Sequence, residues 1–223
     1  MCDSACGGTA KGQWIKRFAA YTMPKSHKAT DKLFGDRKRR MIGTLSGHVV
    51  EIGAGAGANL KYYNTDVRLT VVEPNPFMRP HLLAEAERQN RSLDLLDQGT
   101  ETIPLPDASV DAAVSTLVLC SVGDPARVLG EIARILKPGG RFVFIEHVAS
   151  TPGSLRGRIQ HAINPLWKII GDGCHLTRDT ESALRAASFA AVDCDYFHAG
   201  LSTWLLEPFL AGTAKKTQHL GGV

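Results

Sequence analysis

The segment from Val49 to Asn59 constrains the fold more than any other, because an apolar strand-like run ends there in three alternating glycines, Gly53, Gly55 and Gly57. Glycine has no Cβ, so the chain can adopt backbone angles closed to other residues, and a ligand can lie against bare peptide. Amides at the start of a following helix would point outward as donors to that ligand. About twenty residues later a second apolar run ends in Glu73, where a carboxylate can accept both hydroxyls of a ribose. The two features together predict a bound adenosine.

The glycine turn alone leaves the kind of adenosine cofactor open. Gly53, Gly55 and Ala58 also match the G-x-G-x-x-G/A pattern of dinucleotide binding, which would fit NAD or FAD. Glu51, which precedes the first glycine by two positions, favours a cofactor with an amino-acid part, because a carboxylate there can hold an ammonium directly or through water. S-adenosylmethionine carries such an ammonium, whereas a dinucleotide needs no anion at that place.

Further segments follow the turn in a recognisable order. Residues 99–111 read GTETIPLPDASVD and precede a predicted strand, and residues 134–144 read RILKPGGRFVF and lead into another. In this order the segments resemble class I S-adenosylmethionine-dependent methyltransferases. The stretches 57–60, 73–76, 116–122 (TLVLCSV), 146–149 and 171–178 (GDGCHLTR) narrow the resemblance to the methyltransferase-like thiol S-methyltransferases of animals and their bacterial relatives, over residues 49–215.

The resemblance implies a fold and a reaction. The expected fold is a doubly wound, seven-stranded Rossmann-like sheet whose last strand is antiparallel. The expected cofactor is S-adenosylmethionine, with S-adenosylhomocysteine as product, and the expected reaction is in-line displacement on a small molecule, with an alkyl or aryl thiol or hydrogen sulfide as the leading acceptor. The animal proteins begin with a hydrophobic membrane anchor, whereas the N-terminal residues here are polar.

Two alternatives to thiol methylation stay open. The first is C-, O- or N-methylation of a quinone precursor, a phenol or a lipid amine, because one cofactor half serves all these acceptors and a fold does not fix a function. The second belongs to another class of protein, a regulatory module that binds S-adenosylmethionine without turnover. A sealed acceptor pocket would favour such a module.

The sequence predicts one domain, residues 1–223, in three parts: a basic helical region at 1–45, a cofactor-binding half at 46–148 and an acceptor-side half at 149–223. Strands are expected near 48–52, 68–73, 93–97, 111–116, 141–147, 189–197 and 208–215, with helix and strand alternating throughout. Trp14, Ile15, Phe18 and Tyr21 form an apolar stripe on a predicted helix, which indicates core packing or a lid over the cofactor pocket. The segment 156–178 is interpreted as a helical insertion that principally packs on the core and also walls the acceptor pocket.

The predicted cofactor site collects residues from the carboxyl ends of successive strands, where such sheets bind ligands. Glu73 is the ribose acceptor, Thr100 and Glu101 border the adenine, and Asn75 flanks the adenine or forms a turn. The full set of predicted cofactor-binding residues is Glu51, Gly53, Ala54, Gly55, Gly57, Asn59, Glu73, Pro74, Asn75, Thr100, Glu101, Thr116 and Leu117.

The predicted acceptor site rests on the chemistry of thiols. A thiolate is the nucleophile, and a free thiol with a pKa of about 8.5 is mostly protonated at neutral pH, so a base or a cation would help. His147 and His175 are the candidate bases. Cys120, Trp167, Asp172, Cys174 and Arg178 are the predicted pocket residues, with packing or lining roles for the two cysteines, because direct methyl transfer needs no covalent intermediate.

Composition and charge limit the remaining functions. With 223 residues, 43% of them hydrophobic, the chain can bury one sizeable core. Residues 1–48 hold ten Lys or Arg against three Asp or Glu, and the run 37–40 (RKRR) is interpreted as a solvated helix face that could also touch an anionic membrane. No aromatic series accompanies these charges, so nucleic-acid binding is not expected.

Cysteine usage and hydropathy give the last expectations. The five cysteines are scattered, so reduced thiols are the default, and a cytoplasmic location without a transmembrane segment is predicted. Cys2 and Cys6 lack a nearby ligand pair, and no metal site is predicted. The sequence leaves the oligomeric state open.

Overall fold

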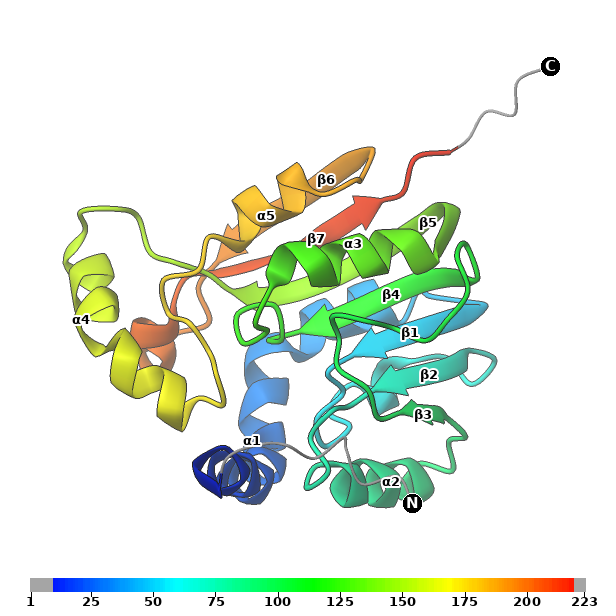
Figure 1. Cartoon of the computed structure of the whole chain (residues 1–223), viewed down its shortest axis with the longest axis horizontal. Coiled ribbons are helices and arrows are strands. Elements are labelled where there is room, and N and C mark those ends of the chain that lie inside the picture. The colour runs from blue at the N-terminus through cyan, green and yellow to red at the C-terminus, as the bar shows by residue number, and fades with distance from the viewer. Residues whose placement is uncertain (1–9, 219–223) are drawn as a thin grey trace.

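The structure is a computed structural model that describes residues 10–218 of the chain. Helices and strands follow one another along a single continuous sheet (Figure 1). The elements are α1 (Ala10–Ile42), β1 (His48–Ile52), β2 (Arg68–Val72), α2 (Arg79–Arg88), β3 (Asp94–Leu96), β4 (Val110–Thr116), α3 (Pro125–Ile135), β5 (Leu136–His147), α4 (Leu155–Ile170), α5 (Thr180–Ala186), β6 (Ala191–Phe197) and β7 (Phe209–Lys215), with short 3-10 helices at Leu60–Tyr62 and Leu201–Leu206.

The sheet has seven strands in the order β3-β2-β1-β4-β5-β7-β6. Strands β1 to β5 pair in parallel, and β7 runs antiparallel between β5 and β6. The predicted doubly wound sheet with an antiparallel last strand is therefore confirmed. Strand order reverses between β1 and β4, and ligands bind such sheets where the order reverses, beyond the carboxyl ends of the strands.

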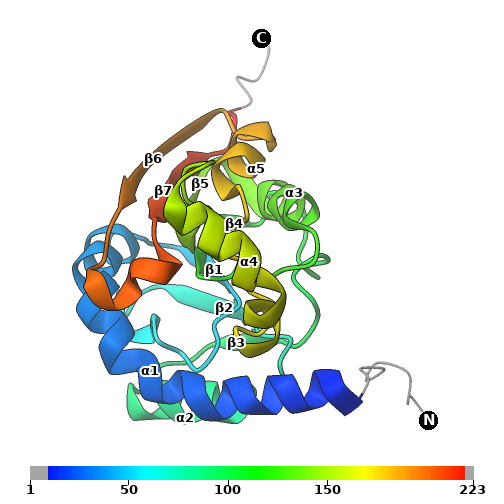
Figure 2. The same cartoon turned by 90° about the vertical axis from the view of Figure 1, so that its left-hand side faces the viewer.

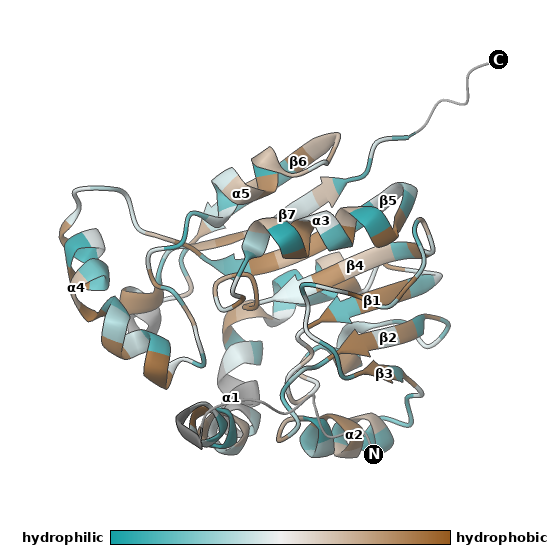
Figure 3. Cartoon of the chain, viewed as in Figure 1, coloured by the Kyte–Doolittle hydropathy of each residue, from teal (hydrophilic) through white to brown (hydrophobic). Residues whose placement is uncertain are grey.

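Each face of the sheet carries its own core, because successive side chains of a strand point to opposite faces. Val50 and Ile52 of β1 join the cluster that contains the buried face of α3 and Leu184 of α5. Val49 belongs to the other cluster, with the end of α1 and Leu82 of α2. The strands form a hydrophobic centre between the helices, whereas α4 lies beyond the end of the sheet (Figure 3).

Two expectations are wrong, one about the connecting segments and one about the start of a strand. Helix and strand do not alternate throughout: the segment between β3 and β4 has no helix, and only a 3-10 turn precedes β2. Pro104 and Pro106 account for the first case, since proline removes backbone donors and blocks helical turns. Strand β5 begins at Leu136 rather than near 141, and residues 137–140 bulge out between its first and second pairings with β4.

Helix α1 confirms the predicted N-terminal helix, but not the interpretation of its apolar stripe as core. Trp14, Phe18 and Tyr21 are 64%, 41% and 67% exposed. Ala19 and Ala20 are the residues of this part that pack inward. Figure 2 shows that α1 bends along its length, and it contains Pro24, the usual cause of a helix bend.

The basic run at 37–40 is not a uniformly solvated face. Lys38 is fully buried, and its ammonium finds no hydrogen-bond partner among the described residues. Arg37 pairs with Asp195 and lies 4.0 Å from the ring centre of Phe197. Arg39 and Arg40 alone keep the exposure that the sequence predicted.

Helix α4 confirms the predicted insertion after the fifth strand, while its predicted role in core packing is wrong. Leu166, Ile169 and Ile170 are 62%, 41% and 51% exposed, and only Gly157 and Gln160 of the helix are buried. Ile159, Ile163 and Trp167 are half-buried, so part of the apolar side of α4 is covered and its C-terminal turns are not. Within the same range, none of the helices combines the length and the hydrophobicity that crossing a membrane requires.

Candidate active site

A cavity of about 310 Å³ lies where the sequence predicts the cofactor, at the carboxyl ends of β1, β2, β3 and β4. Eight of the predicted cofactor residues line it: Gly53, Gly55, Glu73, Pro74, Asn75, Thr100, Glu101 and Leu117. The cavity also takes Lys16 from α1 and Asp172 from the loop after α4. Five strand-end or loop segments far apart in the sequence thus meet around one space.

The glycine turn after β1 forms a bare wall of this cavity. Gly53, Gly55 and Gly57 have φ values of +64°, +56° and +84°, which side chains rarely tolerate. A Cβ on Gly53 would come within 2.7 Å of the Val118 side chain, whereas a Cβ on Gly55 would meet nothing within 4 Å. Gly55 therefore faces free space that a ligand can occupy, and Gly53 keeps the turn close to the loop after β4.

Glu73 is positioned by the two turns that it joins. Its Oε2 accepts the Gly55 amide at 2.6 Å and its Oε1 accepts the Asn75 amide at 2.8 Å. Burial raises the pKa of Glu73, and the two amide hydrogen bonds oppose this rise. A carboxylate has about four acceptor sites, so two remain for the hydroxyls of a ribose. The residue fits the predicted adenosine.

Beneath the glycine turn lies a buried polar network built around Glu51. Its oxygens accept Asn59 Nδ2 and the Tyr63 hydroxyl, both at 2.9 Å, and Asn59 Nδ2 also donates to Thr116. Burial raises the pKa of Glu51 to about 7, although Tyr63 and Asn59 lower it. Glu51 does not line the cavity; nor do Ala54, Gly57, Asn59 and Thr116. The side-chain oxygen Oδ1 of Asn59 is buried without a partner among the described residues and is the spare acceptor of the network.

Helix α1 touches the rim of the cavity through Asn75. The side-chain oxygen Oδ1 of Asn75 accepts the Phe77 amide and so closes a local turn, while Nδ2 of the same side chain donates to the Lys16 backbone carbonyl at 3.2 Å. Asn75 therefore has the predicted turn role and also ties α1 to the site. Sequence reasoning missed Lys16, and the expectation of a lid was the signal that could have found it.

The loop after β4 is held from two sides. Arg178 donates to the carbonyls of Leu119 and Val122, both at 2.7 Å. Glu146, fully buried at the end of β5, accepts the Val118 amide, and burial raises its pKa to about 7. Arg178 thus positions the loop instead of lining the cavity. The sequence places residues 146–149 at the end of the fifth strand but gives Glu146 no role, because only the tertiary fold brings this carboxylate under the loop.

The predicted acceptor residues include a compact group of two thiols and one imidazole. Atoms of Cys120, His147 and Cys174 all lie within 4.8 Å of one another. Cys120 and His147 are 2% and 3% exposed, and Cys174 is half-buried. Among the described residues, no nitrogen or oxygen partner meets the ring nitrogens of His147 or Trp167 Nε1, and both side chains lie beside the Cys174 sulfur, which helps to lower the pKa of Cys174. The thiol of Cys120 holds the pKa of Cys174 well below its ordinary value, whereas this interaction and burial raise the pKa of Cys120.

His175 and Asp172 take different places beside this group. The His175 amide donates to the Cys120 carbonyl at 2.8 Å, while its ring lies outside the thiol and imidazole group. Burial lowers the pKa of His175, and Arg178 and Lys168 lower it further. Asp172 lines the cavity, and burial raises its pKa.

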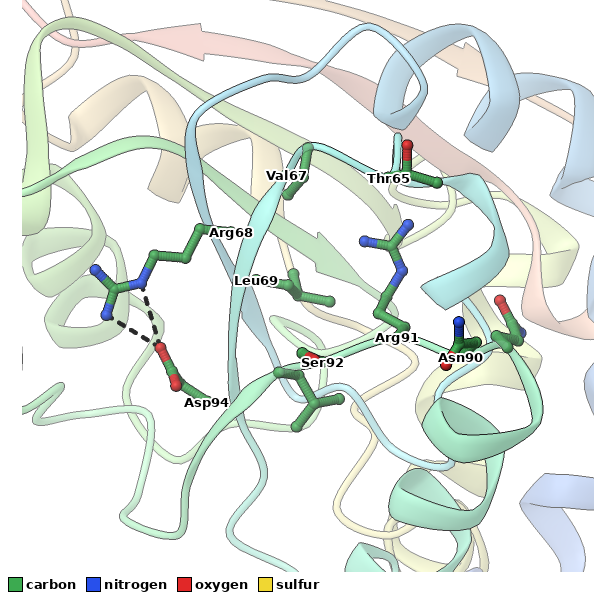
Figure 4. A pocket seen from close by; sticks show the side chains of 10 residues that line it. Thr65, Val67, Arg68, Leu69, Asn90, Arg91, Ser92 and Asp94 are labelled. Carbon is green, nitrogen blue, oxygen red and sulfur yellow. Dashed lines mark hydrogen bonds and ion pairs between the residues drawn. The ribbon is translucent and has the colours of Figure 1, made fainter.

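A second hollow, of about 410 Å³, lies near the amino ends of β2 and β3 (Figure 4). Its lining includes Arg68 and Asp94, which pair with each other at 3.1 Å, and Arg91. None of the predicted site residues reaches it. We place the active site in the smaller cavity, because the glycine turn and the strand-end carboxylate converge there.

The strand order, the glycine turn after β1 and the acidic residue after β2 together define the class I S-adenosylmethionine-dependent methyltransferases. The family described as "Methyltransferase domain" matches residues 50–144. The chain is 35% identical over 216 residues to the thiol S-methyltransferase TMT1A of Homo sapiens, an alignment that covers 91% of this chain and 88% of that protein. It is 38% identical over 172 residues to TMT1B of Rattus norvegicus, with 75% and 70% covered. The chain belongs to the family that contains these proteins.

The fold is also found in a solved structure of low sequence identity. A geranyl diphosphate C-methyltransferase from Streptomyces coelicolor, solved with Mg²⁺, geranyl diphosphate and S-adenosylhomocysteine, superposes with a TM-score of 0.70 at 14% identity. The alignment covers 94% of this chain and 100% of that one. The protein is therefore an S-adenosylmethionine-dependent methyltransferase, and the regulatory module without turnover is set aside.

Proposed function

We propose that the protein transfers the methyl group of S-adenosylmethionine to the sulfur of a small apolar thiol. The observation that carries the proposal is the 35% identity to the human thiol S-methyltransferase TMT1A, because it extends over 91% of this chain and so includes the acceptor side. The acceptor side itself offers sulfur and imidazole groups beside the cavity rather than a pair of carboxylates.

In this proposal the chain holds the cofactor with residues that already face the cavity. Glu73 accepts the ribose hydroxyls, Gly55 lets the ligand lie against the backbone, and Thr100 and Glu101 border the adenine. Beneath the glycine turn and outside the cavity lining, the side-chain oxygen Oδ1 of Asn59 accepts the ammonium of the amino-acid part, and Glu51 fixes the Asn59 side chain. When bound, S-adenosylmethionine supplies an electrophilic methyl group on a sulfonium.

The remaining work of the protein is positioning. Holding a nucleophile and a methyl carbon in line at about 3 to 3.5 Å lowers the barrier by roughly 7 to 11 kcal/mol. Arg178 and Glu146 fix the loop that includes Cys120, and Leu117 at its start has a φ of +58°. Such strain in a cavity-lining residue is typical of functional sites. The helix α1 serves as a lid, with Lys16 at the rim.

The test uses three matched acceptors: benzyl mercaptan, benzyl alcohol and benzylamine. Purified protein is incubated with S-adenosylmethionine and each acceptor, and the products are identified by mass spectrometry. We expect the methyl thioether as the dominant product. A product from the alcohol or the amine alone would keep the methyltransferase assignment and overturn the sulfur acceptor. A heat-denatured sample is the control for uncatalysed methylation of the thiol.

The cellular location of the enzyme and the molecules that it contacts are proposals as well. The cytoplasmic location, the small-molecule acceptor and peripheral contact of the basic N-terminal region with membranes stay predictions. So does the division of one domain into a lid region, a cofactor half and an acceptor half. The exposed apolar side chains of α4 support contact with an apolar acceptor or with an apolar environment that contains it.

A further inference from the structure

We infer that Cys120, His147 and Cys174 form a zinc site whose fourth position receives the acceptor thiol. The inference rests on the proposed function, because it assigns the means by which a thiol acceptor is bound and deprotonated. It departs from the sequence prediction, which placed no metal in this chain.

The donor set fits zinc. Catalytic zinc sites use three protein ligands and keep one position open, and two cysteines with one histidine is an established combination. Zinc bonds of about 2.3 Å to sulfur and 2.0 Å to nitrogen place the ligand atoms of a tetrahedral site roughly 3.5 to 3.8 Å apart. The three candidate atoms already lie within 4.8 Å of one another. Small rotamer changes would therefore complete the coordination.

The state of His147 supports a ligand at this place. It is 3% exposed, and among the described residues its ring has only the Cys174 sulfur as a polar side-chain partner, so at least one ring nitrogen is left without one. A buried polar group without a partner costs roughly 1 to 3 kcal/mol, so native proteins seldom keep one without a reason. A metal bond to one nitrogen removes this cost. The Cys174 sulfur by itself leaves one of the two ring nitrogens without a partner.

The backbone brings the three side chains together with little freedom. Cys120 follows β4, His147 ends β5 and Cys174 follows α4. The His175 amide bonds to the Cys120 carbonyl, which fixes Cys174 beside Cys120. Gly173 has a φ of +85°, and a Cβ there would approach the Ser121 carbonyl oxygen to 3.0 Å. The glycine permits the close approach of the two loops that carry the sulfurs.

The site also lies beside the cofactor cavity. Ser121 and Val122, which follow Cys120, line that cavity, and so does Asp172, two residues before Cys174. Cys120, His147 and Cys174 do not line the cavity themselves, so the proposal assigns the open fourth position to the side of these lining neighbours, toward the cofactor. This placement distinguishes an acceptor-binding metal from a structural one, which would be closed by a fourth protein ligand.

In the proposed reaction, a metal-bound thiolate displaces the sulfonium from the methyl group. The acceptor thiol binds the metal as a thiolate and releases its proton to solvent. A sulfur electron pair forms the new bond to the methyl carbon, and the bond between that carbon and the sulfonium breaks, leaving its electron pair on the departing sulfur. The products are a methyl thioether and S-adenosylhomocysteine. A thioether is a weaker zinc ligand than a thiolate, so the product leaves.

The first experiment measures metal binding directly. The full chain carries Cys2→Ser and Cys6→Ser, so that N-terminal thiols bind no metal, and its zinc content is measured after purification without chelators. Zinc is then removed and Co²⁺ is titrated. We expect one metal per chain and the sulfur-to-cobalt charge-transfer and visible bands of tetrahedral thiolate coordination. Absence of these bands, with free thiols or a disulfide between Cys120 and Cys174, would overturn the inference.

Matched variants locate the ligands. Cys174→Ser and His147→Gln should weaken Co²⁺ binding more than about tenfold, a loss that changes to supporting residues alone already reach. Cys194→Ser, on the half-buried cysteine of β6, is the control and should bind as the parent does. Equal affinity in all three variants would overturn the ligand assignment. The parent titration does not depend on whether a variant folds.

The visible spectrum of the cobalt protein tests whether the fourth coordination position is open to a thiol. Benzyl mercaptan added to the cobalt protein, without S-adenosylmethionine, should shift the visible bands, and benzyl alcohol should leave them unchanged. An unchanged spectrum with the thiol would mean that the site is closed and would overturn acceptor binding. Thiol methylation by metal-free protein would overturn the zinc inference alone. A metal-loaded protein that methylates only alcohol or amine would overturn the proposed function.

Discussion

The two sides of the active site differ in how their polar groups are satisfied. On the cofactor side, both oxygens of Glu73 accept backbone amides and both oxygens of Glu51 accept side chains. On the acceptor side, the buried nitrogens of His147 and Trp167 have only the Cys174 sulfur as a polar side-chain partner within residues 10–218, and α4 exposes apolar side chains. The fold itself thus satisfies the carboxylates of the first side, where Asn59 Oδ1 stays a spare acceptor. On the second side, the described residues supply few partners to the buried nitrogens and the exposed apolar side chains.

The largest expected effect tests this contrast through packing. Leu60→Ala should lower the free energy of unfolding by about 2 to 5 kcal/mol, because Leu60 is fully buried beneath the glycine turn. Leu166→Ala should change the free energy of unfolding by no more than about 0.5 kcal/mol, because Leu166 is 62% exposed on α4. Urea unfolding of both variants measures the difference. Equal losses would break the comparison, because α4 would then pack as tightly as the cofactor side.

The second prediction concerns Glu51 and pH. Burial raises the pKa of Glu51 from 4.5 to about 7, so the folded protein keeps a proton that the unfolded chain releases. Its contribution to stability is complete below pH 4.5 and is lost as the pH rises through 7, by up to about 3 kcal/mol. In the Glu51→Gln variant this loss is absent. Denaturant unfolding between pH 5 and pH 8 checks it, and parallel curves for the two proteins would contradict the prediction.

The third prediction concerns the ribose acceptor. Glu73→Ala should weaken binding of S-adenosylmethionine by roughly 1.5 to 3 kcal/mol, the range for hydrogen bonds to a charged group. Isothermal titration calorimetry gives the affinity, and circular dichroism checks that the fold is kept. Glu87→Ala, an exposed carboxylate on α2, is the matched control. Unchanged affinity in the Glu73 variant would refute the assignment.

The smallest effect is expected at Lys38. Its ammonium is buried without a hydrogen bond, and burial lowers its pKa while Glu51 and Asp31 raise it. Replacement of an imperfectly paired buried charge by a hydrophobic residue of similar size is often stabilising, so Lys38→Met should raise the free energy of unfolding by about 1 kcal/mol. Thermal unfolding and urea unfolding measure it. A loss of stability would mean that the attraction to Glu51 and Asp31 exceeds the cost of burial.

Much of the fold was predictable because its signals are local. Each parallel strand reads as an apolar run, and buried parallel strands have that pattern whatever lies beside them. Element bounds and helix faces were less predictable. An apolar stripe such as Trp14, Phe18 and Tyr21 predicts a helix, but the spacing does not say whether another part of the chain covers it. The same holds for α4, which was predicted to pack principally on the core but exposes Leu166 and Ile170.

The sequence by itself determined the cofactor side. A glycine turn and a carboxylate at the ends of neighbouring strands specify their own backbone conformation, and parallel strands bring their carboxyl ends to one edge of the sheet. Only the tertiary structure decided the acceptor side. Cys120, His147 and Cys174 come from three separate elements, and no local pattern encodes their distance. Their meeting depends on how the loops after β4 and α4 pack on the end of β5, which is a property of the whole fold.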